Sequence, residues 1–397
     1  MRESELFALG LGIVSPWKIV DLDFREGEVH VRVDFEKGSR FNGLSVHDTV
    51  ERCWRHLNFF KYPCFVTARV PRVKHSDGSV RMVEVPWGRP GSGFTLDFEA
   101  HALSLVGQMP VLAAAKELGI HDTRLWRLLR FHVNRAFEAQ EIGCLKRIGV
   151  DETSARKGHD YITVFVDLDA RRVLFACEGR TGVALSLFRQ FLEFKGVDPD
   201  SVEDFSCDMS PAFLSGIEAT FPRAKVTLDK FHLVAMLTKA VDETRKGESK
   251  QYKALQGTRW IWLKNPSNLN SSQQQTLKQF FLQNNFCLTA QAYGFKLQFQ
   301  EIFSLRKKAA ERLLNLWLEN ALESGLRHIE DVATTFFKRR EMILNWFDSK
   351  ISNGVLEGFH SVLQATKHKA RGYRDPRNLI TMSYLLHGKL NAITHYK

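Results

Sequence analysis

The chain has 397 residues, of which 44% are hydrophobic and 25% are charged, so wholesale disorder is excluded and two or three globular domains are expected. No run approaches the roughly 18 consecutive apolar residues of a membrane span, and no secretory signal opens the chain. We therefore expect a cytoplasmic protein, in the cytosol or on the nucleoid, with no membrane partner. The formal net charge of +11 favours an anionic partner, most commonly nucleic acid.

Residues 1–93 are predicted to form a small β-rich module. Polar and apolar residues alternate over residues 29–35 and 65–73, which is the period of a half-buried strand. Residues 80–85 repeat the pattern after a turn at Ser76–Ser79. The segment 86–93 is rich in Pro and Gly and therefore reads as a connector to the next domain.

Residues 94–142 are predicted to form a helix-turn-helix DNA-binding domain. A first helix ends at Gly119, and a second helix begins near His121 with Asp122 as its expected N-cap. The second helix carries a row of basic residues, namely Arg124, Arg127 and Arg130. This layout favours DNA binding by the three arginines, and an ordinary helical hairpin with a solvated basic face is the alternative.

The remainder is predicted to be an α/β core with an RNase H-like mixed sheet, formed by residues 143–230 and 350–397. Three short apolar runs come first and alternating helices and strands follow, which is the order of such a sheet. Residues 231–349 read as a large helical insertion. The expected strands are residues 147–151, 161–168, 172–177, 202–208 and 225–228.

Three acids in this core are the candidate catalytic residues and metal ligands. Asp151 closes the first expected strand and Asp208 the fourth, and the carboxyl ends of strands face the ligand crevice of an open sheet. Adjacent carboxylates repel each other unless a cation neutralises them, and two Mg²⁺ or Mn²⁺ ions would do so. Glu357 supplies the third ligand from a helix that Ser352 or Asn353 can cap. Such a site performs in-line phosphoryl displacement.

The sequence around these acids resembles the ISL3 family of insertion-sequence transposases. The resemblance implies a DDE transposase with an RNase H-like core, divalent metal ions and terminal inverted repeats as substrate, with Asp151, Asp208 and Glu357 as catalytic acids. It covers nearly the whole chain from about residue 50. The segments that carry it are residues 86–87, 94–95, 148–153, 157–159, 207–210, 227–232, 352–360 and 370–374.

The N-terminal module departs from the family pattern. Family members usually carry two C-x-x-C pairs there, which is a zinc-ribbon pattern. Residues 40–44 and 74–78 occupy the places of these pairs without the cysteines, and the chain's six cysteines are scattered. We therefore expect no zinc, and the module is a degenerate zinc-ribbon-like fold.

Further residues have both a functional and a structural interpretation. His232, in a D-x-x-H pair with Asp229, either contacts the scissile phosphate or orients a helix start, and Asp229 is a rival metal ligand. Trp260 either stacks on an unpaired DNA base or is a buried core residue. Lys157 and His159 either contact phosphate or lie in a solvated turn. A basic stretch after Glu357 is expected to contact DNA through Lys367, Lys369, Arg371 and Arg374.

The leading hypothesis is a DNA transposase that binds terminal inverted repeats, cuts DNA and joins it to target DNA. Bringing two ends together requires a synapsed complex, for which a homodimer is expected. An RNase H-like nuclease that cuts without joining is one alternative. A DNA-binding regulator that keeps the core as an idle scaffold is another.

Overall fold

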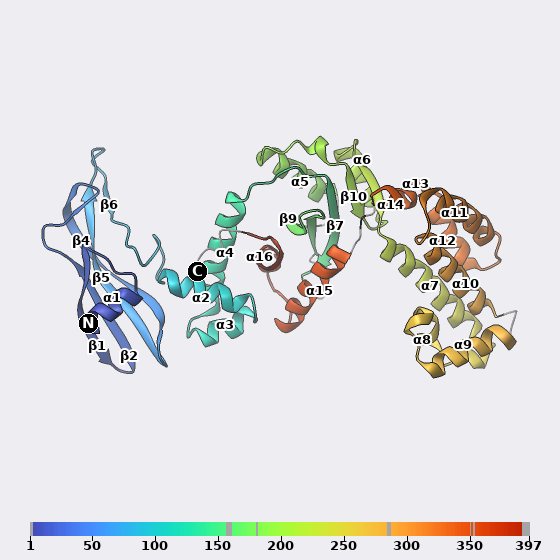
Figure 1. Cartoon of the computed structure of the whole chain (residues 1–397), viewed down its shortest axis with the longest axis horizontal. Helices are drawn as coiled ribbons and strands as arrows, with labels where there is room; N and C mark the ends of the chain where they lie inside the picture. Colours follow the sequence, from blue (N-terminus) through green and yellow to red (C-terminus); the bar gives the residue numbers. More distant parts are fainter. Residues whose placement is uncertain are drawn as a thin grey trace. The chain divides into compact units, whose positions relative to one another are not determined.

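The structure is a computed structural model that describes residues 3–155, 161–179, 182–283, 287–349, 351 and 354–390 (Figure 1). The chain divides into two compact units, one formed by the residues up to Gln140 together with Leu390 and the other running from Glu141 to Lys389. In the described residues, no helix is long and apolar enough to cross a membrane.

The first unit begins with a six-stranded sheet whose main order is β1-β2-β5-β4-β3, with β6 paired to β5. Valines on β2 and β5 form its core, together with the packed rings of Trp17, Trp54 and Trp87. Three of these strands were predicted, whereas β1 and the long β4 were missed because charged residues break their apolar alternation. The elements are α1 (Glu3–Gly10), β1 (Trp17–Arg25), β2 (Glu28–Phe35), β3 (Arg40–Phe41), β4 (Leu44–Phe59), β5 (Tyr62–Lys74) and β6 (Val80–Met82).

Three helices complete the first unit: α2 (Leu96–Val106), α3 (Val111–Glu117) and α4 (Asp122–Ala139). Gly119 lies between α3 and α4 with φ +65°, a conformation that glycine adopts without strain. The expected N-cap of α4 was off by one residue. His121 is the cap, and its side chain accepts a hydrogen bond from the backbone of Thr123. Asp122 is already helical.

A buried carboxylate joins the connector to these helices. Glu99 on α2 is 1% exposed and lies 2.6 Å from His132 on α4. Arg89 and Ser92 of the connector donate to the same carboxylate at 2.8 and 2.5 Å. Burial disfavours the charged form, but these hydrogen bonds outweigh it and hold the pKa of Glu99 below its ordinary value. The network therefore fixes the segment before α2 against the helical domain.

The second unit contains a five-stranded sheet of order β11-β10-β7-β8-β9. Strands β7, β8 and β9 run antiparallel, whereas β10 and β11 run parallel to β7. The sequence predicted three meandering strands followed by alternating helices and strands, and the structure adds that the last two strands run parallel to β7. The strands are β7 (Arg147–Ser154), β8 (Tyr161–Asp167), β9 (Arg172–Glu178), β10 (Asp204–Cys207) and β11 (Lys225–Leu228).

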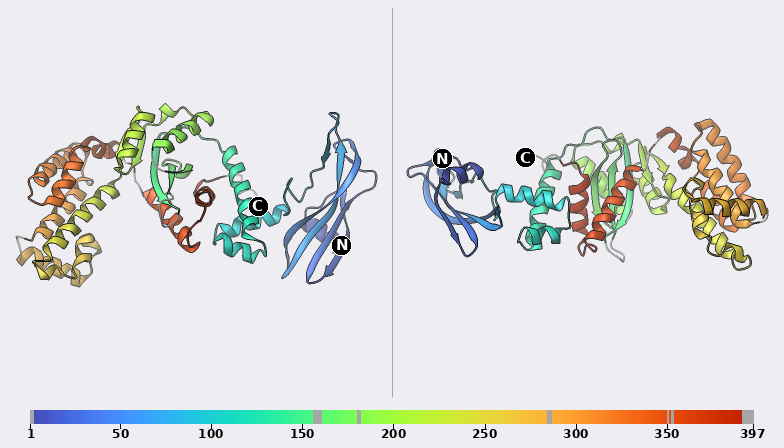
Figure 2. Two further views of the ribbon diagram at one scale, coloured as in Figure 1. Left: turned by 180° about the vertical axis from the view of Figure 1, so that it is seen from behind. Right: turned by 60° about the horizontal axis from the view of Figure 1, so that its bottom comes forward.

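Helices cover this sheet on both faces (Figure 2). Ile148 and Val150 of β7 point to one face and pack with α5 (Gly182–Phe194) and α6 (Pro211–Thr220). Gly149, between them, points to the opposite face and meets Leu356 of α15 (Gly354–Lys369). Helix α16 (Pro376–His387) packs along β8 and β9.

A helical bundle is inserted into the chain between β11 and α15. It has its own core, in which Trp262, Tyr293, Phe299 and Phe336 are fully buried. The predicted helical character of this segment is confirmed. Its helices are α7 (Lys230–Glu248), α8 (Arg259–Leu263), α9 (Ser271–Gln283), α10 (Leu288–Ile302), α11 (Lys307–Leu322), α12 (Arg327–Phe337), α13 (Arg340–Leu344) and α14 (Trp346–Ser349).

Candidate active site

Strand register brings three aspartates to neighbouring positions of the sheet. In the parallel pair β10 and β7, Asp204 lies opposite Arg147, and continuing this offset places Asp208 beside Asp151. In the pair β10 and β11, Asp204 lies opposite Lys225, and the same continuation places Asp229 beside Asp208. Asp208 and Asp229 follow directly after their strands, as predicted for Asp208. Asp151 does not close its strand, because β7 continues to Ser154 in a ladder with β8.

The electrostatics of Asp151 show how closely charged groups gather around it. Burial raises the pKa of the Asp151 carboxyl, and the negative charge of Asp208 acts in the same direction. His360, His232 and the backbone N–H of Glu152 act in the opposite direction. Asp151 and Asp208 therefore share one electrostatic environment.

Helix α15 lies along β7, and contacts at each step fix its position. Leu356 meets Gly149, and His360 Nε2 lies 3.5 Å from Asp151 Oδ2. Gln364 donates a hydrogen bond of 2.8 Å to Thr153 on the same face of the strand. Side chains four residues apart on the helix thus meet side chains two apart on the strand.

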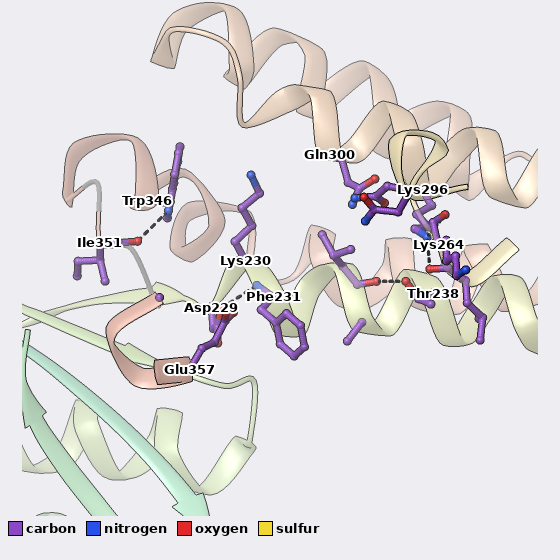
Figure 3. Close-up of a pocket in the computed structure, with 16 residues that line it drawn as sticks. Asp229, Lys230, Phe231, Thr238, Lys264, Lys296, Gln300, Trp346, Ile351 and Glu357 are labelled. Atoms are coloured by element: carbon purple, nitrogen blue, oxygen red, sulfur yellow. Dashed lines mark hydrogen bonds between the residues drawn. The ribbon is translucent and has the colours of Figure 1, made fainter. Parts of the chain in front are cut away.

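Glu357 lies one residue beyond this contact face. Its side chain is exposed and lines the same cavity as Asp229 (Figure 3). Figure 3 shows Glu357 and Asp229 close together at the start of α15 and α7. The caps proposed for this helix, Ser352 and Asn353, lie outside the described residues.

Asp229 and His232 form a hydrogen-bonded pair at the start of α7. One oxygen of Asp229 accepts from the backbone N–H of Phe231 at 2.7 Å and thereby caps the helix. Its other oxygen lies 2.8 Å from His232 Nδ1. This bond raises the pKa of His232, burial opposes it, and the charges of Asp151 and Asp208 add to the rise. His232 therefore lies near all three aspartates.

The acids supply carboxylate oxygens, which Mg²⁺ and Mn²⁺ prefer as ligands. Within the described part of the chain, however, no three His, Cys, Asp or Glu side chains are arranged to hold a metal ion. Asp151 and Asp208 are brought together by the sheet, whereas Glu357 is brought to Asp229. The predicted triad is thus placed around one region of the sheet but is not gathered into one coordination sphere.

Comparisons with known proteins show the family to which this chain belongs. The ISL3 DDE family model, described as Transposase, matches residues 148–383, which span the sheet, the helical bundle and α15. A second model, the helix-turn-helix domain of transposase family ISL3, matches residues 83–133. The chain belongs to the ISL3 family of transposases.

Two relatives match across most of their length. The transposase for insertion sequence element IS1557 of Mycobacterium tuberculosis is 25% identical over 369 residues, covering 84% of this chain and 81% of that protein. The transposase for insertion sequence element IS1001 of Bordetella parapertussis is 26% identical over 347 residues, covering 83% of each. Family membership supports a DNA-processing enzyme of the DDE type with a DNA-binding helix-turn-helix, and the family generally implies divalent metal ions.

The arginines of the transposase's helix-turn-helix differ in their surroundings. Arg127 is exposed on α4. Arg124 is also exposed, but its guanidinium lies 4.4 Å from the centre of the Phe94 ring, which holds it against the connector. Arg130 is half-buried. Arg127 therefore has the surroundings best suited to a DNA contact, and the assignment of all three to DNA stays a prediction.

The basic residues after Glu357 also differ in their surroundings. Lys367 donates to the backbone carbonyl of Ser154 at 3.0 Å, and burial lowers its pKa, so this lysine holds α15 on β7. Lys369, Arg371 and Arg374 are exposed near the end of α15. Lys157 and His159, which the sequence placed near phosphate, lie outside the described residues.

Trp260 is exposed, and the neighbouring Trp262 is the buried core residue. The side chain of Trp260 is 60% exposed on α8, whereas Trp262 is fully buried. The interpretation of Trp260 as a core residue was therefore wrong. Sequence reasoning also missed the contact of His360 with Asp151, although the spacing of three between Glu357 and His360 placed both on one side of a helix.

Proposed function

We propose that this transposase cuts and joins DNA by metal-dependent, in-line phosphoryl transfer at Asp151, Asp208 and Glu357. The observation that carries the proposal is the register of β7 and β10, which sets Asp151 beside Asp208. The strand order, with β7 between the antiparallel and the parallel parts of the sheet, supports an RNase H-like core. Asp229 extends the row of acids by one strand and is the rival ligand.

The residues fit a divalent cation in their chemistry, because each acid offers hard oxygen donors. Asp151 and Asp208 would hold Mg²⁺ or Mn²⁺, with two ions per site, and Glu357 would complete the set from α15. Bound divalent ions would polarise the attacking and leaving oxygens of the phosphodiester. His232 is oriented by Asp229 through Nδ1, and in the protonated form that this carboxylate favours, Nε2 would donate a hydrogen bond to a phosphate oxygen.

DNA recognition is assigned to the exposed basic residues. Arg124, Arg127 and Arg130 would bind the terminal inverted repeats through α4. Lys369, Arg371 and Arg374 would contact phosphates of the transposon end or target, with Lys367 positioning their helix. In the synapsed complex we infer a homodimer, acting in the cytoplasm. The proposed domains remain residues 1–93, 94–142, 143–230 with 350–397, and the insertion 231–349.

Substituting Asp208→Asn tests the catalytic assignment. We expect strand cleavage of a labelled transposon end to fall by at least about 1,000-fold, because a neutral amide replaces a metal-binding carboxylate. Binding of the same end, measured by gel shift, should stay within about twofold. Glu203→Gln is the matched control, since its side chain is exposed at the start of β10 and pairs with Lys146. Cleavage that survives Asp208→Asn would refute the assignment.

The same labelled end separates the alternatives. A transposase yields products in which the end is joined to target DNA, whereas a nuclease yields cut ends alone. A regulator that keeps the core as scaffold binds the end and produces neither. Joined products that vanish with Asp208→Asn are the expected result.

A further inference from the structure

A cavity of about 910 Å³ opens beside Asp229 and Glu357 (Figure 3). Its wall is formed by the first turns of α7, the segment that follows α8, the end of α10 and the start of α15. The volume lies within the roughly 300–1,000 Å³ of pockets that enclose a small organic ligand. A single nucleotide therefore fits, and it would lie directly next to the candidate catalytic acids.

Phe231 presents an aromatic face to this cavity. Its side chain is 58% exposed, although the next apolar residues along α7, Leu233 and Leu237, are fully buried. Its backbone N–H donates to the Asp229 carboxylate at 2.7 Å, and its ring packs edge-on against the His232 ring with the centroids 5.8 Å apart. Figure 3 shows Phe231 and Lys230 pointing in opposite directions, with Lys230 toward Trp346. The ring therefore presents exposed aromatic surface in the cavity beside an acid of the site, where it can contact a ligand.

The opposite wall offers hydrogen-bonding groups in a fixed segment. Asn265 and Asn268 have exposed amide side chains, each with donors and an acceptor. Two hydrogen bonds from α10 hold the backbone just before these asparagines. The ammonium of Lys296 donates to the carbonyl of Leu263 at 3.0 Å, and the hydroxyl of Tyr293 donates to the carbonyl of Lys264 at 2.8 Å. The cavity thus combines a stacking surface with amide groups on a held backbone segment, the pairing that recognises a nucleobase.

We propose that this cavity receives one unpaired nucleotide of the transposon end, with its base stacked on Phe231 and its edge facing Asn265 and Asn268. The inference rests on the proposed function, since it names the DNA conformation that the same site acts on. Trp260 is the competing aromatic, but it is not part of the cavity wall. A base held beside the acids would place the adjoining phosphodiester near the carboxylates.

The test uses the full-length protein with Mg²⁺ and a transposon end that carries 2-aminopurine at successive positions around the cut. Wild-type protein should raise the fluorescence at one position, where the base leaves the duplex. Phe231→Ala should abolish this rise and slow cleavage about 10- to 100-fold, the loss expected for one base–aromatic stack. Phe231→Trp should retain both. Phe337→Ala is the control, because Phe337 is equally exposed on α12.

A second substrate distinguishes stacking from a structural role. An abasic site at the responsive position removes the base that must be unpaired, so Phe231→Ala should cut this DNA within about twofold of the wild-type rate. A defect that persists on abasic DNA would overturn the proposal. Wild-type cleavage without any fluorescence rise would also overturn it. Loss of the fluorescence rise and slower cleavage with Trp260→Ala would overturn it as well. In each of these cases the proposed transposase chemistry stands. If wild-type protein cuts no end at all, the proposed function falls first, and this inference with it.

Discussion

Lys296 is a charged residue in the core of the helical bundle. Its side chain is 1% exposed, and its ammonium contacts the carbonyl oxygens of Leu263 and Lys264 just after α8. Burial lowers the pKa of Lys296 to about 8, because an ammonium loses its hydration there. This residue holds the wall of the proposed nucleotide cavity while carrying a desolvation penalty.

The depressed pKa predicts how stability depends on pH. Between pH 8 and about 10.4, the unfolded chain binds a proton at Lys296 that the folded chain has released, so raising the pH stabilises the fold. We expect the free energy of unfolding to rise in this window by at most about 1.4 kcal/mol per pH unit relative to Lys296→Met. Urea unfolding at pH 7.5, 8.5 and 9.5 measures the difference. Lys239→Met, an exposed residue of α7, should show no such trend.

At the scale of elements, the packing of α15 on β7 determines where Glu357 lies. Gly149 leaves room for Leu356, because a Cβ at this position would be 2.7 Å from Leu356 Cδ1. The contacts of His360 with Asp151 and of Gln364 with Thr153 continue this interface between α15 and β7. A shift of this helix therefore moves Glu357 relative to Asp151 and Asp208 without removing any of the acids.

Gly149→Ala should consequently impair cleavage as well as stability. We expect a loss of about 1–3 kcal/mol in unfolding free energy, as for other overpacked cores, and at least a roughly tenfold loss of strand cleavage. Adding Leu356→Ala frees the space and should restore part of the cleavage. Gly247→Ala on α7 is the control, since its Cβ would meet nothing within 4 Å. Unchanged cleavage by a folded Gly149→Ala protein would contradict the importance of the interface between α15 and β7.

At the scale of the whole molecule, the candidate DNA-recognition helix and the candidate catalytic acids belong to different compact units. The net charge of +11 supports association of the whole chain with DNA. Binding and cleavage should therefore be separable by substitution. Asp208→Asn should reduce cleavage and leave binding intact, whereas a substitution on α4 should reduce binding and leave the cleavage chemistry intact.

Arg127→Ala is expected to weaken binding of the transposon end while leaving the catalytic unit intact. If Arg127 contacts a phosphate, the slope of log affinity against log salt should fall by about 1. Cleavage at saturating protein should return to near the wild-type rate. Arg223→Ala removes the same charge from an exposed position that pairs with Asp200 and serves as the control. An unchanged affinity and salt slope would remove Arg127 from the DNA interface.

Local patterns in the sequence were sufficient for the strands of the second unit, whereas the assignment of its catalytic acids stays a prediction. Alternating and continuous apolar runs predicted the five strands, because burial of a face depends on residues close together in the chain. Strand ends pointed to Asp208 and Asp151, but Asp151 lies within β7, which continues to Ser154. Flanking residues indicated the ISL3 family, which the family models confirm.

Only the tertiary structure decided which of these residues meet. Register between β7, β10 and β11 set Asp229 in the same row as Asp151 and Asp208, and helix packing paired Asp151 with His360. It also tied Lys367 to Ser154, a contact between residues 213 positions apart. Such contacts depend on how separate elements pack, and no local periodicity encodes that. The sequence therefore determined the strands and indicated the family, whereas the packing of distant elements decided the geometry around the candidate acids.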